Sequence, residues 1–87
     1  MANTYVFYSD PGHGWIAVER QELMALGILF QVSHYSYQKG NMVYLEEDCD
    51  ASLFIKAKRD AGIEVKLVEH DSNYDSHIRN YSPFCSK

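Results

Sequence analysis

The stretch DCDASLFIKAKRDAGIEVKLVEH, residues 48–70, decides the fold class, because it predicts a helix that leads directly into a strand. Its first part, 48–62, has an apolar stripe at helical spacing, formed by Leu53, Phe54, Ala57 and Ala61. Its second part, 63–70, alternates as a half-buried strand does, with Ile63, Val65 and Leu67 on the inner face. Helical and strand periods side by side indicate an α+β protein.

The ends of the predicted helix carry residue types that helix termini favour. Asp48 or Asp50 can cap the first turn, where negative charge is stabilised. Gly62 can end the helix. The outer face and last turns hold basic residues, which are favoured there: Lys56, Lys58 and Arg59.

Towards the N-terminus, the sequence predicts a β-hairpin. Residues 4–9, TYVFYS, are aromatic and β-branched, and residues 13–19, HGWIAVE, resume an extended pattern. Asp10-Pro11-Gly12 supplies turn chemistry between them. Alternation places Trp15 and Ala17 on one face of the second strand and Ile16 and Val18 on the other.

The middle of the chain predicts a short helix followed by two strands. Residues 20–27 place Leu23, Met24 and Leu26 on one helical face, and Gly27 suits the position after the helix. Part of 28–38 is expected to be a strand, with a turn at 39–41 and a return strand at 41–47.

These elements give the order β-β-α-β-β-α-β in a single domain, 1–87. We expect a small mixed or antiparallel sheet of about five strands with two helices on one face. The tail, 71–87, has no clear period but is apolar enough to dock on the body through Tyr74, Ile78, Tyr81 and Phe84.

Composition narrows the possible functions. The chain has 8 Lys and Arg against 12 Asp and Glu, for a net charge of −4, and its basic residues are scattered. This distribution argues against direct nucleic-acid binding and suits either solubility or a basic partner. Cys49 and Cys85 are expected to be free thiols in a cytoplasm, since the sequence predicts no signal peptide and no membrane-spanning run.

The loop YSDPGHGW, residues 8–15, is the first candidate binding site. Gly12 and Gly14 allow close approach of a ligand, His13 can titrate or coordinate, and Trp15 can stack. The alternative is a plain hairpin turn with Trp15 in the core.

An acidic run is the second candidate: Glu46, Glu47, Asp48 and Asp50. It could attract a cation, or it could be only a strand end and a helix cap. The histidines and cysteines show no short-spaced ligand pair, so we expect no metal site and no cofactor, although distant residues could still assemble one.

Two further sets could bind a ligand. In an extended tail, alternation would place Asp75, His77, Arg79 and Tyr81 on one face, a grouping suited to phosphate. Tyrosines form the other set, Tyr35, Tyr37 and Tyr44 with Tyr5 and Tyr8 near them in the pattern, either as a recognition surface or as cross-strand packing.

Three segments together, DPGHGW, YSYQKGNMVYLEEDCDA and DSHIRNY, resemble small accessory proteins of bacteriophages and other mobile elements. The resemblance implies a cytoplasmic, often oligomeric protein that acts in a bacterial host, and it transfers no catalytic residue. We therefore expect a non-enzymatic protein that binds and inhibits or modulates a host protein, such as a defence component. The alternative is a module that sequesters a small molecule or nucleotide through the loop and the tail.

Overall fold

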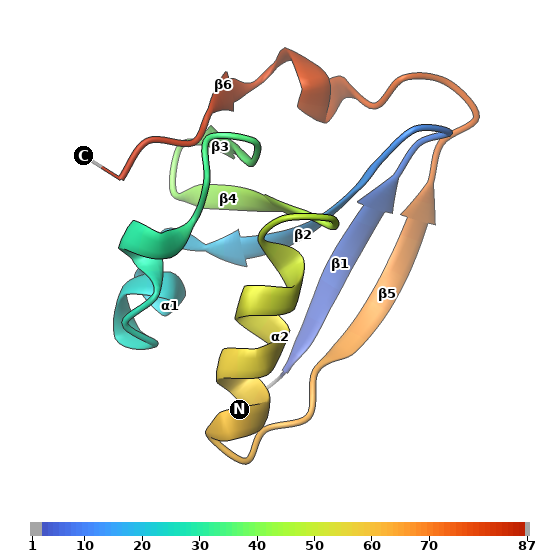
Figure 1. The fold of residues 1–87 in the computed structure, drawn as a ribbon. Helices are drawn as coiled ribbons and strands as arrows, with labels where there is room; N and C mark the ends of the chain where they lie inside the picture. Colours follow the sequence, from blue (N-terminus) through green and yellow to red (C-terminus); the bar gives the residue numbers. More distant parts are fainter. Residues whose placement is uncertain (1–2, 87) are drawn as a thin grey trace.

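The computed structural model describes residues 3–86 and confirms the α+β class; residues 1, 2 and 87, which the predicted domain includes, lie outside this part. Its strands form one six-stranded sheet in the order β5-β1-β2-β4-β3-β6 (Figure 1). The strands are β1 (Thr4–Ser9), β2 (Gly14–Glu19), β3 (Tyr37–Lys39), β4 (Met42–Glu46), β5 (Lys66–Asp71) and β6 (Ser82–Pro83). The helices are α1 (Arg20–Ala25) and α2 (Ala51–Asp60), with 3-10 turns η1 (Leu29–Gln31) and η2 (His77–Asn80).

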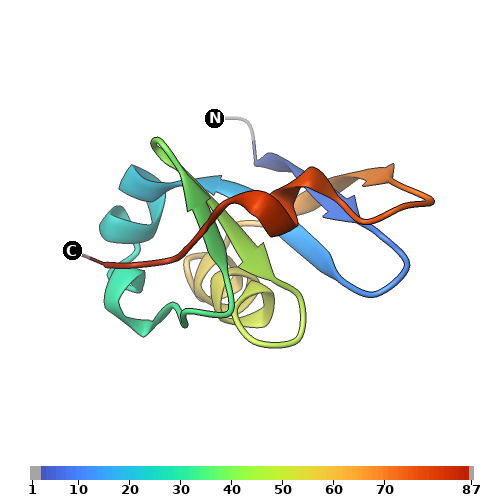
Figure 2. The same ribbon diagram turned by 90° about the horizontal axis from the view of Figure 1, so that it is seen from above.

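The main core lies between one face of the sheet and the two helices. Ile16 and Val18 of β2 pack there with Leu23 of α1 and Phe54 of α2, all nearly inaccessible to solvent. The C-terminal tail crosses the opposite face of the sheet, as Figures 1 and 2 show from two directions. The sheet is therefore covered on both faces near β2 and β4.

The predicted hairpin is confirmed, since β1 and β2 pair antiparallel with Tyr8 opposite Trp15. The predicted end of α1 is also confirmed. Gly27 has a positive φ of 74°, and the next backbone N–H, that of Ile28, donates to the Leu23 carbonyl at 3.1 Å. However, Met24 is 60% exposed, so its predicted place on the buried face of α1 is wrong.

Lys58 does not lie on the outer face of α2 as predicted, because it is 4% exposed. It follows the buried Phe54 by four residues, so both side chains lie on the same helical face. Its Nζ atom donates to Glu22 Oε2 at 2.6 Å and to Asn3 Oδ1 at 3.1 Å. A partner on α1 thus overrides the expectation that lysine is solvated.

The half-buried strand predicted at 63–70 is confirmed only in part, because Ile63 and Val65 are partly buried but lie before β5 (Lys66–Asp71). β5 pairs in parallel with β1 at the sheet edge, and all six of its residues are exposed, including Leu67 and Val68. The alternation in the sequence correctly predicts a strand. It does not predict burial, because the β5 residues at this sheet edge stay exposed on both faces.

Two other segments differ from the expectation. The strand predicted within 28–38 begins only at Tyr37, after η1 and a turn. The tail docks through Ile78 and Phe84, but Tyr74 is 83% exposed, and β6 adds a sixth strand beside β3. Within residues 3–86, no helix has the length and apolar character needed to cross a membrane.

Candidate functional site

Asp10 joins the loop between β1 and β2 to the C-terminal tail. Its carboxylate is fully buried and accepts hydrogen bonds from the backbone N–H groups of Gly12 (3.0 Å), His13 (2.9 Å) and Ser76 (2.8 Å). Arg79 donates to both oxygens, Nε at 2.6 Å and Nη2 at 2.9 Å. The Arg79 guanidinium holds the pKa of Asp10 well below its usual range, and Asp10 raises the pKa of Arg79. The loop and the tail therefore meet as one charged unit.

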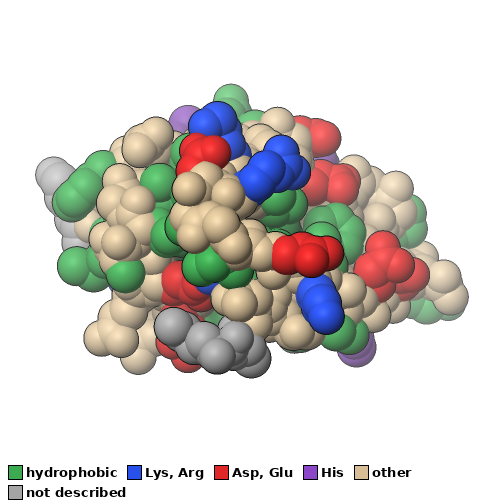
Figure 3. Space-filling view, turned by 90° about the horizontal axis from the view of Figure 1, so that it is seen from below, with side chains coloured by type: hydrophobic (Ala, Val, Ile, Leu, Met, Phe, Trp, Pro, Cys, Tyr) green, Lys and Arg blue, Asp and Glu red, His purple; other side chains and the backbone are tan. Residues whose placement is uncertain are grey.

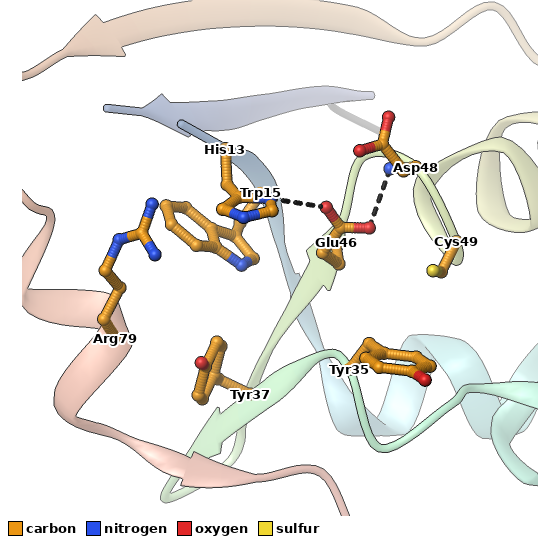
Figure 4. A pocket seen from close by; sticks show the side chains of 8 residues that line it. All are labelled: His13, Trp15, Tyr35, Tyr37, Glu46, Asp48, Cys49 and Arg79. Atoms are coloured by element: carbon orange, nitrogen blue, oxygen red, sulfur yellow. Dashed lines mark hydrogen bonds and ion pairs between the residues drawn. The ribbon is translucent and has the colours of Figure 1, made fainter. Parts of the chain in front are cut away.

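Trp15 lies directly beside this ion pair. The Arg79 guanidinium carbon is 5.6 Å from the centre of the indole ring, and the side chain of Trp15 is only 1% exposed. Its Nε1 atom is buried and has no hydrogen-bond partner among residues 3–86. In Figure 4, this nitrogen faces the space bounded by Tyr37 and Tyr35. The structure thus presents an unused hydrogen-bond donor to that space.

The space is a cavity of about 250 Å³ on the face of the sheet opposite the helices (Figure 4). The cavity joins segments from across the chain: His13, Trp15, Tyr35, Tyr37, Glu46, Asp48, Cys49 and Arg79 line it. Trp15 and Tyr37 meet edge to face, with their ring centres 6.2 Å apart. Its walls are therefore largely aromatic, with charged groups at the ends.

One end of the cavity holds a cluster of possible metal ligands. His13 Nδ1 lies 3.2 Å from Glu46 Oε1, and the backbone N–H of Asp48 donates to Glu46 Oε2 at 2.8 Å. One ligand atom from each of these three residues lies within 4.8 Å of the other two. The pairing of β2 with β4 brings them together, because Trp15 lies opposite Glu46.

Cys49 adds a thiol to this end of the cavity. Partial desolvation and then the neighbouring Glu46 carboxylate raise the pKa of the Cys49 thiol above its usual value. The thiol is therefore protonated at neutral pH, which makes it a weak nucleophile.

The four acidic residues do not form one exposed patch. Glu46 and Asp50 are buried, whereas Glu47 and Asp48 are exposed. Asp50 precedes α2 as predicted but makes no cap hydrogen bond with its side chain. Its carboxylate instead accepts from Ser33 and Ser36, and so holds the loop before β3.

The extended face predicted for the tail is also wrong, because residues 77–80 form the turn η2. Only Arg79 of that set lines the cavity. His77 and Tyr81 pack against each other and near Tyr8, while Asp75 is exposed. A 3-10 turn changes the direction of successive side chains, so alternation does not hold there.

The tyrosines divide between the two faces of the sheet. Tyr37 and Tyr44 are paired on β3 and β4, and Tyr44 packs near Tyr8. Burial is the main cause that raises the pKa of the Tyr44 hydroxyl, and the neighbouring Tyr81 and Tyr8 raise it further. Tyr5 instead packs edge to face on Phe54 in the main core, at 5.0 Å between ring centres, and Tyr35 is 61% exposed at the cavity rim.

The two loop glycines serve packing within the chain rather than the cavity wall. A Cβ atom at Gly12 would lie 2.9 Å from Arg79 Nη2, and one at Gly14 would lie 2.3 Å from the Phe7 ring. Neither position has a positive φ, so these close approaches, and not the backbone conformation, favour glycine there.

Sequence reasoning missed Asp10 as a functional residue and treated His13 and Glu46 as parts of separate candidates. An Asp-Pro-Gly turn is visible in the sequence, but its ion-pair partner lies 69 residues away. No local sequence pattern indicates that Arg79 is this partner.

Comparisons with protein-family models, curated proteins and solved structures found no match.

Proposed function

We propose that this protein is a non-enzymatic binding module that holds a compact, flat ligand in the cavity beside Trp15. The observation that supports it most is the buried Trp15 Nε1, which has no acceptor among the described residues. A buried donor without a partner costs free energy, and a ligand oxygen placed there would remove that cost. The ring of Tyr37 offers an apolar wall beside it.

The cavity size limits the ligand. At roughly 30 Å³ for each water of liquid volume, 250 Å³ holds about eight waters. A single ring that carries a carbonyl, such as a nucleobase or an aromatic carboxamide, has a suitable size. A whole nucleotide would extend out past the exposed Tyr35 at the rim.

A binding role suits the chemistry of the cavity better than catalysis does. The raised pKa of Cys49 keeps the thiol protonated, and the Arg79 guanidinium already pairs with Asp10 through two nitrogens. No serine lines the cavity among residues 3–86. These features favour binding over covalent catalysis in this cavity.

Binding can be tested by titrating the protein with benzamide, nicotinamide and uracil in the presence of EDTA, with toluene as the probe that lacks oxygen. We expect saturable binding of at least one carbonyl probe, measured by calorimetry. Trp15→Phe, which removes only the N–H donor and part of the ring, should weaken it about tenfold. Tyr74→Ser, which changes an exposed aromatic residue outside the cavity lining, is the matched control. Equal affinity for toluene and the carbonyl probes, or no binding at all, would contradict the proposal.

A second candidate function is binding of a host protein, as the resemblance to phage accessory proteins implies. It is supported by the exposed apolar side chains Met24 (60%) and Phe30 (82%), which lie on α1 and η1, two elements in contact. Charges of both signs are interspersed on the face in Figure 3, so this face is not the uniformly basic surface that nucleic-acid binding favours.

This second function predicts a complex that depends on Phe30. Size-exclusion chromatography with light scattering should show a discrete larger species when the protein is mixed with bacterial lysate, and Phe30→Ser should abolish it. Thr4→Ser, a conservative surface change, should leave it intact. A complex that survives Phe30→Ser would count against this surface. The same experiment on the protein alone measures the predicted homo-oligomer.

A further inference from the structure

We propose that His13, Glu46 and Asp48 bind a divalent transition-metal ion of the zinc class at the end of the cavity. Their donor set combines one imidazole nitrogen with carboxylate oxygens, which together suit zinc and its first-row neighbours better than calcium or magnesium. This site goes beyond the proposed ring-binding function and does not require it.

The separation of the His13 and Glu46 donor atoms fits a shared metal. His13 Nδ1 and Glu46 Oε1 are 3.2 Å apart, longer than the roughly 2.7–2.9 Å of a charge-assisted hydrogen bond. Two ligands about 2.0–2.1 Å from a tetrahedral zinc ion lie about 3.3 Å from each other. The pair therefore has nearly the spacing that a metal would require, with little movement of either side chain.

Burial explains why a cation is needed here. The side chain of Glu46 is 8% exposed, and its only ion-pair partner among residues 3–86 is His13. A buried carboxylate is costly without a compensating charge, and imidazole is charged only when protonated. A metal ion supplies that charge with His13 neutral. The 44% exposure of His13 leaves a path for the ion from solvent.

Hydrogen bonds already position two of the three ligands, His13 and Glu46. Asp10 fixes the His13 backbone at 2.9 Å, and the Asp48 backbone N–H orients the Glu46 carboxylate at 2.8 Å. The buried, unpartnered Trp15 Nε1 belongs to the same cavity wall, on the residue paired with Glu46.

Titration with Co²⁺, without any organic probe, tests the site. We expect binding of one ion with the visible absorption of four- or five-coordinate cobalt, and its displacement by Zn²⁺. His13→Asn should weaken binding by at least about tenfold, and so should Glu46→Gln. His13 is a surface residue, so its variant keeps the proposal testable if Glu46→Gln does not fold by circular dichroism.

A matched variant separates this site from adventitious surface binding. His70→Asn changes an exposed histidine on β5 and should leave cobalt affinity unchanged. No saturable binding, or equal losses in His13→Asn and His70→Asn, would overturn the metal site. Loss of cobalt binding beside retained benzamide binding in EDTA would overturn only the metal site. The reverse pattern would overturn only the ring-binding function.

Discussion

Replacing Asp10 with alanine is expected to lower the free energy of unfolding by about 3 kcal/mol or more, measured by urea denaturation at pH 7. The change removes the acceptor of three backbone N–H groups and leaves Arg79 without its carboxylate partner. Because the buried carboxylate joins the loop to the tail, the variant should also expose Trp15. A red shift of the fluorescence of this single tryptophan would report that exposure.

Asp10→Asn is the matched comparison, because it keeps one oxygen acceptor for the loop but loses the charge. We expect its stability to lie between those of Asp10→Ala and the unchanged protein. If Asp10→Ala changed stability by less than about 0.5 kcal/mol, as ordinary surface substitutions do, the ion pair would not be what holds the tail.

The same carboxylate predicts how stability depends on acid. The pKa of Asp10 is lowered in the folded protein, so its contribution is complete above the unfolded-chain value of about 3.9. It is lost as the pH falls below that value towards the folded pKa, while Arg79 stays charged. Between about pH 4 and pH 2, the stability of Asp10→Asn should therefore fall less steeply than that of the unchanged protein.

Replacing Glu22 with leucine is expected to lower the free energy of unfolding by about 2–3 kcal/mol, because it leaves the buried ammonium of Lys58 without its carboxylate partner. The double variant Glu22→Leu/Lys58→Met should recover most of the loss, since two apolar side chains often replace a buried pair at little cost. A double-mutant cycle in urea measures this coupling.

Alkaline titration gives an independent test of this pair. Burial opposes the charge on Lys58, but its hydrogen bonds with Glu22 and Tyr5 outweigh that effect and raise its pKa above 10.5. Burial, with Glu22, also raises the pKa of Tyr5 above 10.0. Both groups hold protons more tightly when folded, so stability present at pH 8 should fall as the pH rises through their folded pKa values. If the stability of the double variant Glu22→Leu/Lys58→Met fell equally with rising pH, this pair would not be the cause of the alkaline loss.

Residue patterns predicted the local structure where short-range chemistry controls it. The strand at 4–9, the Asp-Pro-Gly turn and the helix that ends before Gly62 depend on alternation, fixed φ and helical period, each of which acts over a few residues. The sequence predicted less well which side chains of a helix or strand face the core. Lys58 is buried although the sequence predicts it exposed, because it pairs with the distant Glu22. Met24 is exposed although the sequence predicts it buried, because no element covers it.

The candidate site shows the same division. The sequence alone indicated that His13, Trp15, Glu46 and Arg79 were worth attention, because glycine-rich turns, carboxylate runs and guanidinium groups are common at sites. Only the tertiary structure joined them. The His13–Glu46 contact spans 33 residues, and the Asp10–Arg79 pair spans 69. Such contacts follow from strand register and from the path of the tail across the sheet. Neither the register nor the path can be predicted from the types of residues that lie far apart in the chain.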